Sequence, residues 1–283
     1  MKSLVLKTGI KIPKLGITTY KIGENPDLLS REINALEYAV AGGIRLIDTS
    51  EMYGKGMAES IVGKAIEKFN RKELFLVSKI YPFNCTKEKI YYSIENTLKR
   101  LKTDYLDLYL IQWAGPISFQ ESVNCLEELR KKRYIKHWGV SNFDLFNMEK
   151  LLHVIDGDHC VVNQVLYHLG SRGTEFELQG FMKKKGIKIM AYCPMAMGGI
   201  LNTKLIHNSK LQKIACKYNI SIQGLLLAFV LSRENIIPIP KSTDKKHIDE
   251  ILKIGRMVLE RSDLKILDKI FPPPSCRQFL DIV

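Results

Sequence analysis

Residues 74–113, LFLVSKIYPFNCTKEKIYYSIENTLKRLKTDYLDLYLIQW, carry the clearest indication of the fold. It begins with one apolar run, Leu74–Lys79, and ends with another, Leu106–Ile111, and each has the length of a β-strand. The segment between them repeats apolar residues at the spacing of one helix face, namely Ile90, Ile94, Leu98 and Leu101. A strand, a helix and a second strand in this order predict two parallel strands joined by a crossover helix.

The same alternation extends outward in both directions. Six further strands are predicted, at Leu15–Tyr20, Ile44–Ile47, Ile135–Val140, Cys160–Val165, Ile187–Tyr192 and Ile236–Ile239. Eight strands that alternate with helices favour an α/β fold of the (β/α)8 TIM-barrel type, as a single domain over residues 1–283. A doubly wound open sheet is the alternative, but the GxGxxG turn expected after its first strand is missing. A short N-terminal β-hairpin is expected over Leu4–Ile12, turning at Thr8-Gly9.

Charge and hydropathy argue against two kinds of partner. The chain has 43 Lys and Arg against 30 Asp and Glu, a net charge of +13 that raises the question of nucleic-acid binding. The lysines are spread over predicted helix faces without an aromatic-interleaved basic motif, so we expect no nucleic-acid partner. The longest apolar stretch, Leu225–Leu231, is too short to cross a bilayer, and the N-terminus lacks the apolar core of a signal peptide. We therefore expect a cytoplasmic protein without a membrane partner.

The six cysteines offer no recognisable metal site. They lie at positions 85, 125, 160, 193, 216 and 276, and no two of them form a CxxC pair. No group of histidines and cysteines has metal-ligand spacing, so we expect no metal. Free buried thiols are the simplest interpretation, with a disulfide as the alternative.

Polar residues end seven of the eight predicted strands. In chain order they are Asp48, Lys79, Gln112, Ser141-Asn142, Gln164, Tyr192 and, just after the eighth strand, Lys241. The carboxyl ends of barrel strands open into one mouth, where barrel enzymes keep their active sites. We therefore expect these side chains to meet in one pocket.

The residues around these strand ends resemble the motifs of the aldo-keto reductase family. Asp48-Thr49-Ser50-Glu51-Met52-Tyr53-Gly54 is similar to the family's DTAxxYG, and residues 139–143 match its GVSNF without a change. The other matches are Lys79 with the family's strand lysine, LYLIQW (108–113) with LYLIHW, Asn163-Gln164 with NQ, AYCP (191–194) with AYSP, and IPKS (239–242) with IPKS. The motifs keep the family's order over nearly the whole chain. The resemblance implies a prokaryotic-type member with a short C-terminal tail that reduces aldehydes or ketones and works as a monomer.

Carbonyl reduction needs a hydride donor and an acid for the developing alkoxide. By resemblance Tyr53 is this acid, and Lys79 and Asp48 are two further members of the catalytic tetrad. A free tyrosine has a pKa near ~10, and an ammonium within about 4–6 Å lowers it by favouring the phenolate. We therefore predict that Lys79 lowers the pKa of Tyr53 and that Asp48 anchors the lysine. The alternative is a packing tyrosine beside a structural salt bridge.

Gln112 departs from the family, which has histidine at the fourth tetrad position. A glutamine does not titrate, but its amide can donate a hydrogen bond to a substrate carbonyl and orient it. We predict that Tyr53 remains the acid and that Gln112 positions the carbonyl. The departure leaves open a catalytically weak or inactive NADP-binding protein on the same fold. A phosphate-handling isomerase or aldolase with Lys79 as base or nucleophile is a third possibility, in which Asp48 and Tyr53 would lack a role.

The resemblance also implies a nicotinamide cofactor. Ser141, Asn142 and Gln164 suit its carboxamide, and Tyr192 offers a flat face to the ring. Lys241, Ser242 and Thr243 suit a ribose 2′-phosphate, which favours NADPH with NADH as the alternative. The remaining expected cofactor residues are Thr19, Asp48, Cys193, Pro194, Met195, Ile239, Gly198 in the loop over the pyrophosphate, Glu250 at the adenine, and His247.

His247 stands where the family often has arginine, so we expect a loose preference for NADPH over NADH, looser still when His247 is neutral. The substrate pocket is expected to be framed by aromatic residues beside Gln112. They are Tyr20, Tyr53, Tyr81 and Trp113, with Phe279 of the tail as a further candidate. Such walls favour a small to medium apolar or aromatic carbonyl compound.

Overall fold

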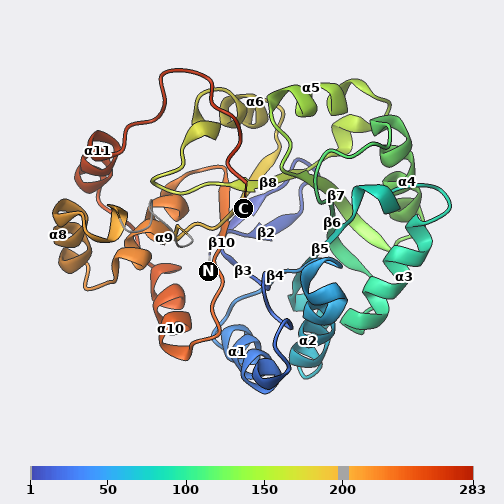
Figure 1. Ribbon diagram of the computed structural model, residues 1–283, viewed down its shortest axis with the longest axis horizontal. Coiled ribbons are helices and arrows are strands. Elements are labelled where there is room, and N and C mark those ends of the chain that lie inside the picture. Colours follow the sequence, from blue (N-terminus) through green and yellow to red (C-terminus); the bar gives the residue numbers. More distant parts are fainter. Residues whose placement is uncertain (1, 197–203, 283) are drawn as a thin grey trace.

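The computed structural model describes residues 2–196 and 204–282. Its main sheet contains eight parallel strands in chain order, and it curves into a barrel surrounded by helices (Figure 1). The two edges of the sheet meet, because the Thr18 N–H donates a hydrogen bond to the Pro240 carbonyl oxygen at 3.0 Å. The predicted (β/α)8 architecture is confirmed.

All eight predicted strands are present, with slightly different ends. They are β3 (Gly16–Thr18), β4 (Leu46–Asp48), β5 (Phe75–Ile80), β6 (Leu106–Ile111), β7 (Ile135–Ser141), β8 (Val162–Leu166), β9 (Lys188–Tyr192) and β10 (Ile236–Ile239). The predicted hairpin is also present, as β1 (Ser3–Val5) paired antiparallel with β2 (Lys11–Pro13).

Helices follow the strands and cover the outside of the barrel. They are α1 (Leu29–Ala41), α2 (Met57–Ile66), α3 (Ile90–Leu101), α4 (Phe119–Lys131), α5 (Leu145–His153), α6 (Leu178–Lys184), α8 (Ser209–Lys217), α9 (Ile222–Ser232), α10 (Lys245–Ile254) and α11 (Arg261–Ile270). Within the described ranges no single helix is long and apolar enough to span a membrane; α8 and α9 reach that composition only as a pair, which is bent by 78°.

The hydrophobic core has two layers, which follow from the alternation of side chains along each strand. On β6, Leu108 and Leu110 point into the barrel, where they belong to an inner cluster with Val77 of β5. Tyr109 and Ile111 of the same strand belong to the outer layer between the sheet and the helices. The strands are buried on both faces, which explains their almost continuous apolar runs.

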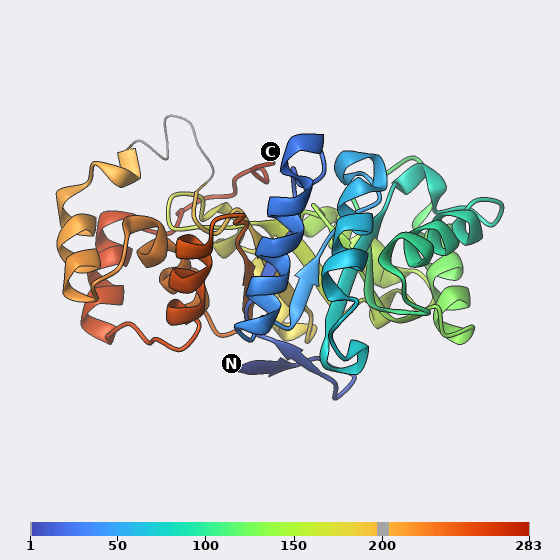
Figure 2. The ribbon, with the colours of Figure 1, turned by 90° about the horizontal axis from the view of Figure 1, so that it is seen from below.

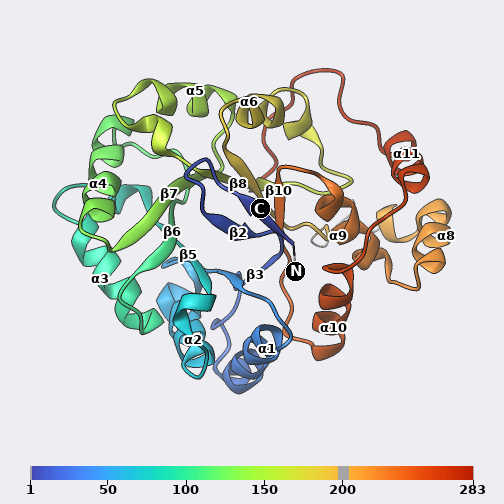
Figure 3. The same cartoon turned by 180° about the vertical axis from the view of Figure 1, so that it is seen from behind.

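The hairpin closes one end of the barrel. It lies across the barrel in Figure 3, and Figure 2 shows it at the end opposite the C-terminal tail. Leu6, which follows β1, and Ile12 of β2 are buried in the inner cluster. The carboxyl ends of the strands therefore form the open mouth, where the predicted site residues lie.

Candidate active site

A buried ion pair lies at the base of the mouth. Asp48 is in register with Val77 of the neighbouring strand, so Lys79 lies two residues further along, on the same face of the sheet. Lys79 Nζ lies 2.7 Å from Asp48 Oδ1, and both side chains are fully buried. The same Nζ donates to the Thr49 carbonyl oxygen at 2.7 Å, and Thr18 Oγ1 donates to Asp48 Oδ2 at 2.7 Å. These bonds satisfy the two buried charges, which would otherwise be costly to bury.

Tyr53 follows β4 and begins a short 3₁₀ turn, Tyr53–Gly56. The turn requires glycine at position 54, where φ is +54° and an added Cβ would lie 3.0 Å from the Gly23 carbonyl oxygen. Lys79 Nζ lies 4.9 Å from the centroid of the Tyr53 ring, and the Tyr20 ring packs edge-on at 5.3 Å. The predicted juxtaposition of this tyrosine with the buried ammonium is therefore present.

The predicted direction of the Tyr53 pKa is wrong. Burial raises the pKa of Tyr53 well above its usual value, the Asp48 carboxylate raises it further, and a hydrogen bond from Gln112 opposes both. The Lys79 charge does not reverse this, because Asp48 balances it at 2.7 Å. Burial also lowers the pKa of Lys79, against the opposing effect of Asp48. The phenol is held in its protonated form.

Gln112 directly follows β6, and its side chain lies at the cavity wall. Its N–H donates to the Ile80 carbonyl oxygen at 3.0 Å, and its own carbonyl oxygen accepts from Asn142 Nδ2 at 3.3 Å. Ser50 Oγ donates to Gln112 Oε1 at 2.8 Å. The amide is thus fixed at one end, by a hydroxyl from the loop that carries Tyr53.

A cavity of about 470 Å³ opens above these residues. Twelve residues from the predicted sites line it: Tyr20, Tyr53, Gln112, Ser141, Asn142, Gln164, Tyr192, Cys193, Pro194, Met195, Ile239 and Lys241. The sequence analysis missed Thr18, Lys21, Met52, Ala196, Gln223 and Pro240, which also line it. Thr18 ends β3, so the strand-end rule applied to the first strand would have found it. Gln223 comes from α9, and nothing in the sequence pattern marks it.

Several side chains predicted to bind the nicotinamide form hydrogen bonds with one another or with Asp48. Gln164 Nε2 donates to Asp48 Oδ1 at 2.8 Å, and among the described residues Gln164 Oε1 has no hydrogen-bond partner. Ser141 Oγ donates to the Gln164 carbonyl oxygen at 3.0 Å, and Tyr192 Oη donates to Asn142 Oδ1 at 2.9 Å. Gln164 Oε1 could accept a hydrogen bond from the NH₂ of a carboxamide, and the half-buried Tyr192 ring could stack on a nicotinamide ring.

Some predicted residues support the cavity from behind or lie outside it. Asp48 and Lys79 are fully buried beneath it, as is Thr19, whose Oγ1 donates to the Asp48 carbonyl oxygen at 3.2 Å. Tyr81 and Trp113 do not line it. Their rings pack edge-on at 5.8 Å, and both contact the Phe83 ring. The three rings therefore pack against one another outside the cavity.

Phe279, the further candidate from the tail, does not line this cavity. Its side chain is 98% exposed and lines a separate hollow of about 200 Å³. That hollow is lined also by Phe146 and Phe176, after β7 and β8. The tail ends over the middle of the barrel (Figure 1), but none of its described residues lines the 470 Å³ cavity.

Of the residues predicted for the 2′-phosphate, Thr243 lies at an open hollow and Ser242 does not. Thr243 lines an open hollow with Arg31 of α1 and Lys245, and Arg31 Nε donates to the Thr243 carbonyl oxygen at 3.3 Å. The sequence analysis missed Arg31, because nothing local links it to the loop before α10. Ser242 Oγ is instead engaged with the Asp244 backbone, accepting from its N–H at 3.1 Å.

Glu250 is engaged at the start of α9, where its carboxylate accepts from the Ser221 N–H at 2.6 Å and from its hydroxyl at 2.7 Å. His247 is exposed on α10. Gly198 lies outside the described residues. The adenine and pyrophosphate contacts of these three residues stay predictions.

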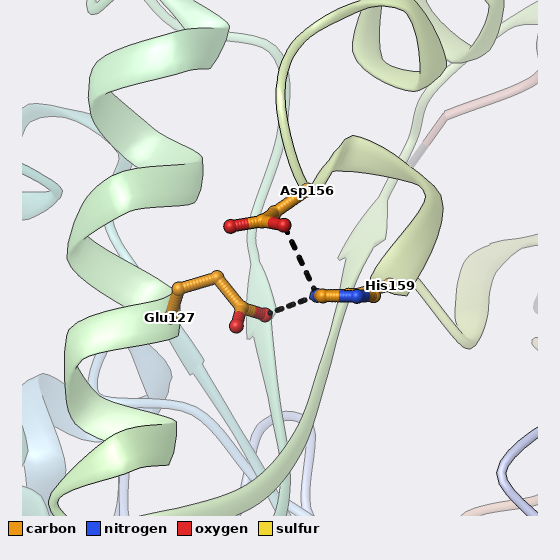
Figure 4. A group of neighbouring side chains, drawn as sticks. All are labelled: Glu127, Asp156 and His159. Atoms are coloured by element: carbon orange, nitrogen blue, oxygen red, sulfur yellow. Dashed lines mark ion pairs between the residues drawn. The ribbon is translucent and has the colours of Figure 1, made fainter.

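Glu127, Asp156 and His159 lie within reach of a common point, as a metal site would require (Figure 4). Glu127 is, however, already saturated. It accepts from Arg130 Nη2 at 2.6 Å, from Trp138 Nε1 at 2.6 Å, and lies 3.1 Å from His159 Nδ1. A cation here would have to displace a guanidinium, so we interpret the group as a structural network.

A closed barrel, a buried carboxylate–ammonium pair and a protonated tyrosine at the mouth define the class of protein. The chain belongs to the aldo/keto reductase family, whose sequence model matches residues 14–271. It is 39% identical over 282 residues to methylglyoxal reductase YeaE of Escherichia coli, covering 100% of this chain and 99% of that protein. It is 33% identical to glyoxal reductase of Bacillus subtilis, covering 94% and 91%. A Klebsiella pneumoniae aldo/keto reductase in complex with NADP and acetate superposes with a TM-score of 0.96 at 38% identity, covering 100% and 99%.

Proposed function

We propose that this protein reduces small aldehydes and ketones to alcohols with NADPH, and that Tyr53 donates the proton. The observation that carries the proposal is the buried tyrosine at the cavity wall, beside the ion pair of Lys79 and Asp48. A proton donor must be protonated before the reaction, and the raised pKa of Tyr53, caused chiefly by burial, holds it so.

The cofactor residues support NADPH as the partner. Gln164 and Tyr192 would hold the nicotinamide end, and Lys241 with Thr243 the 2′-phosphate end. When bound, NADPH supplies the hydride. The Klebsiella pneumoniae relative was crystallised with NADP, and a second structure of such a protein with NADPH has a TM-score of 0.95.

The protein's own groups then act on the carbonyl oxygen. Tyr53 Oη donates its proton to this oxygen as negative charge develops there, and the Gln112 amide donates a second hydrogen bond that orients it. The Lys79 ammonium, held by Asp48 and the Thr49 carbonyl, is the nearest compensating charge for a phenolate on Tyr53. Gln112 thus takes an orienting role and no proton-transfer role.

Two relatives are named for their substrates, methylglyoxal and glyoxal. We propose the same class, small 2-oxoaldehydes, as the first substrates to test. The cavity of about 470 Å³ includes the residues assigned to the nicotinamide, so only part of it is left for the substrate. Its walls carry both aromatic rings and amide groups, which suits a carbonyl compound with a second polar group.

The test is NADPH oxidation, followed by absorbance, over methylglyoxal, glyoxal and a panel of aldehydes and ketones. Tyr53→Phe should lower kcat by about 10²–10⁴-fold, because it removes one positioned acid. Its affinity for NADPH, measured by fluorescence titration, should stay unchanged. Tight NADPH binding by the wild type without oxidation on any carbonyl compound would instead support an inactive cofactor-binding protein.

A further inference from the structure

Ser50 and Gln112 form a buried pair at the wall of the cavity. Ser50 Oγ donates to Gln112 Oε1 at 2.8 Å, Ser50 is fully buried, and Gln112 is 6% exposed. The same hydroxyl accepts a hydrogen bond from the Met52 N–H at 3.2 Å. A serine hydroxyl has a single proton, and the backbone donor of Met52 leaves that proton to Gln112.

This pair decides which end of the Gln112 amide faces the site. The backbone of Gln112 is fixed on both sides, by the Ile80 carbonyl and by Asn142 Nδ2. The remaining freedom is a flip of the amide, which exchanges a donor for an acceptor. Because Ser50 occupies Oε1, the donor Nε2 is left for Tyr53, which receives a hydrogen bond from Gln112.

The two ends of the amide have opposite effects on a carbonyl substrate. The NH₂ group stabilises a developing oxyanion, whereas the amide oxygen would repel it. The histidine of the family motif has no amide, so this exchange of donor and acceptor by a flip is specific to glutamine. The motifs that the chain resembles have alanine and histidine where this chain has Ser50 and Gln112. The two departures thus lie in direct contact.

We propose that Ser50 is a positioning residue, whose hydroxyl holds the Gln112 amide with its donor end toward the reacting carbonyl. The inference rests on the proposed function, because it assigns a partner to a group that acts in carbonyl reduction. Ser50 itself acts only through Gln112. Its effect should therefore vanish when the amide is absent.

The first test is a double-mutant cycle of Ser50→Ala and Gln112→Met, the latter retaining length without an amide. Ser50→Ala should lower kcat about tenfold, the factor that corresponds to one neutral hydrogen bond, without changing the affinity for NADPH. In the Gln112→Met background the same substitution should leave kcat unchanged. Equal effects in both backgrounds, or a wild-type kcat for Ser50→Ala, would overturn the proposal.

The second test does not depend on turnover. The side-chain amide resonances of Gln112, identified by their loss in Gln112→Met, should shift or broaden in Ser50→Ala. They should stay unchanged in Ser93→Ala, which removes a buried hydroxyl on α3. Ser50→Cys, close in size but a weaker donor, should give an intermediate kcat and serves if the alanine variant does not fold.

The two proposals fail in different ways. If no carbonyl compound is reduced, the proposed function fails, whatever the amide resonances show. If the wild type is an active reductase and Ser50→Ala leaves both kcat and the Gln112 resonances unchanged, only the role of Ser50 fails.

Discussion

At the scale of single residues, Tyr53 shows how burial and charge compete. Its hydroxyl is close to an ammonium, yet its pKa is raised, first by burial and then by Asp48. The carboxylate that anchors Lys79 also opposes the lysine's field at the tyrosine, because the two charges are only 2.7 Å apart. An ion pair therefore acts on its neighbours as a dipole and not as a single charge.

We expect Tyr53 to remain protonated in the free protein up to pH 10 and beyond. A difference titration of tyrosinate absorbance, wild type minus Tyr53→Phe, measures its ionisation directly. The difference should stay flat below pH 10, since both burial and Asp48 raise the pKa of Tyr53. Ionisation of this residue below about pH 9 would mean that Lys79 dominates after all.

At the scale of elements, the Glu127 carboxylate joins α4 to β7 through a hydrogen bond. Glu127 of α4 accepts from the buried Trp138 indole of β7 at 2.6 Å and from Arg130 of its own helix. Burial alone would raise the pKa of Glu127, but its hydrogen bonds with Arg130, Trp138 and His159 together hold it below the usual value. The carboxylate is therefore charged and fully bonded at neutral pH.

Glu127→Ala should destabilise the fold by about 2–4 kcal/mol, because it leaves a buried indole N–H without a partner and removes a bonded charge. Urea denaturation followed by circular dichroism measures the change. The neighbouring Glu128→Ala, which removes a partly exposed ion pair with Lys132 and a hydrogen bond from the Tyr91 hydroxyl, should cost only about 1 kcal/mol. Similar losses for the two variants would show that the Trp138 bond contributes little.

Two elements far apart in the sequence, α1 and the loop before α10, form the hollow that we propose for the 2′-phosphate. Arg31 of α1 lies beside Thr243 and Lys245, and we expect it to supply the cation for which the family often has arginine at the position of His247. We expect Arg31→Ala to raise the Kd for NADPH about tenfold, in line with the loss of one charge-assisted hydrogen bond. NADH, which lacks this phosphate, is the internal control. Equal changes for the two cofactors would exclude a phosphate contact.

At the scale of the whole molecule, the C-terminal tail packs against the segment that follows β8. Ser171 donates a hydrogen bond to the Asp281 carboxylate, and Arg277 Nε lies 3.1 Å from Glu177 Oε2. His168 is buried in this region and accepts from the Gly170 N–H at 3.1 Å through Nδ1. Burial lowers the pKa of His168 to about 4, against the opposing effect of Asp281.

The lowered pKa of His168 should make the molecule less stable in mild acid. The unfolded chain binds this proton near pH 6.5 and the folded protein near pH 4, so the free energy of unfolding falls as the pH drops between these values. The loss is about 3 kcal/mol for a shift of this size. In urea denaturation at pH 7 and pH 4.5, His168→Asn should lose less stability than the wild type. The exposed His153→Asn should behave as the wild type does, and a parallel loss in all three would contradict this prediction.

The number, type and order of the strands, the hairpin, and the set of polar residues at the strand ends could all be predicted from the sequence. These features depend on local periodicity and on the rule that parallel barrel strands open into one mouth, so no distance between elements was needed. Asp48, Lys79 and Gln112 were found in this way, whereas Tyr53 and the grouping of the four as a tetrad came from the resemblance to the family's motifs.

Only the tertiary structure decided the direction of the Tyr53 pKa, the contact between Ser50 and Gln112, and the place of Arg31 beside Thr243. It also showed that Tyr81, Trp113 and Phe279 lie outside the cavity and that Gln223 of α9 lines it. Each of these depends on burial and on distances of a few ångströms between elements far apart in the chain. Periodicity in one segment carries no information about such distances, because they arise only when the whole barrel has closed.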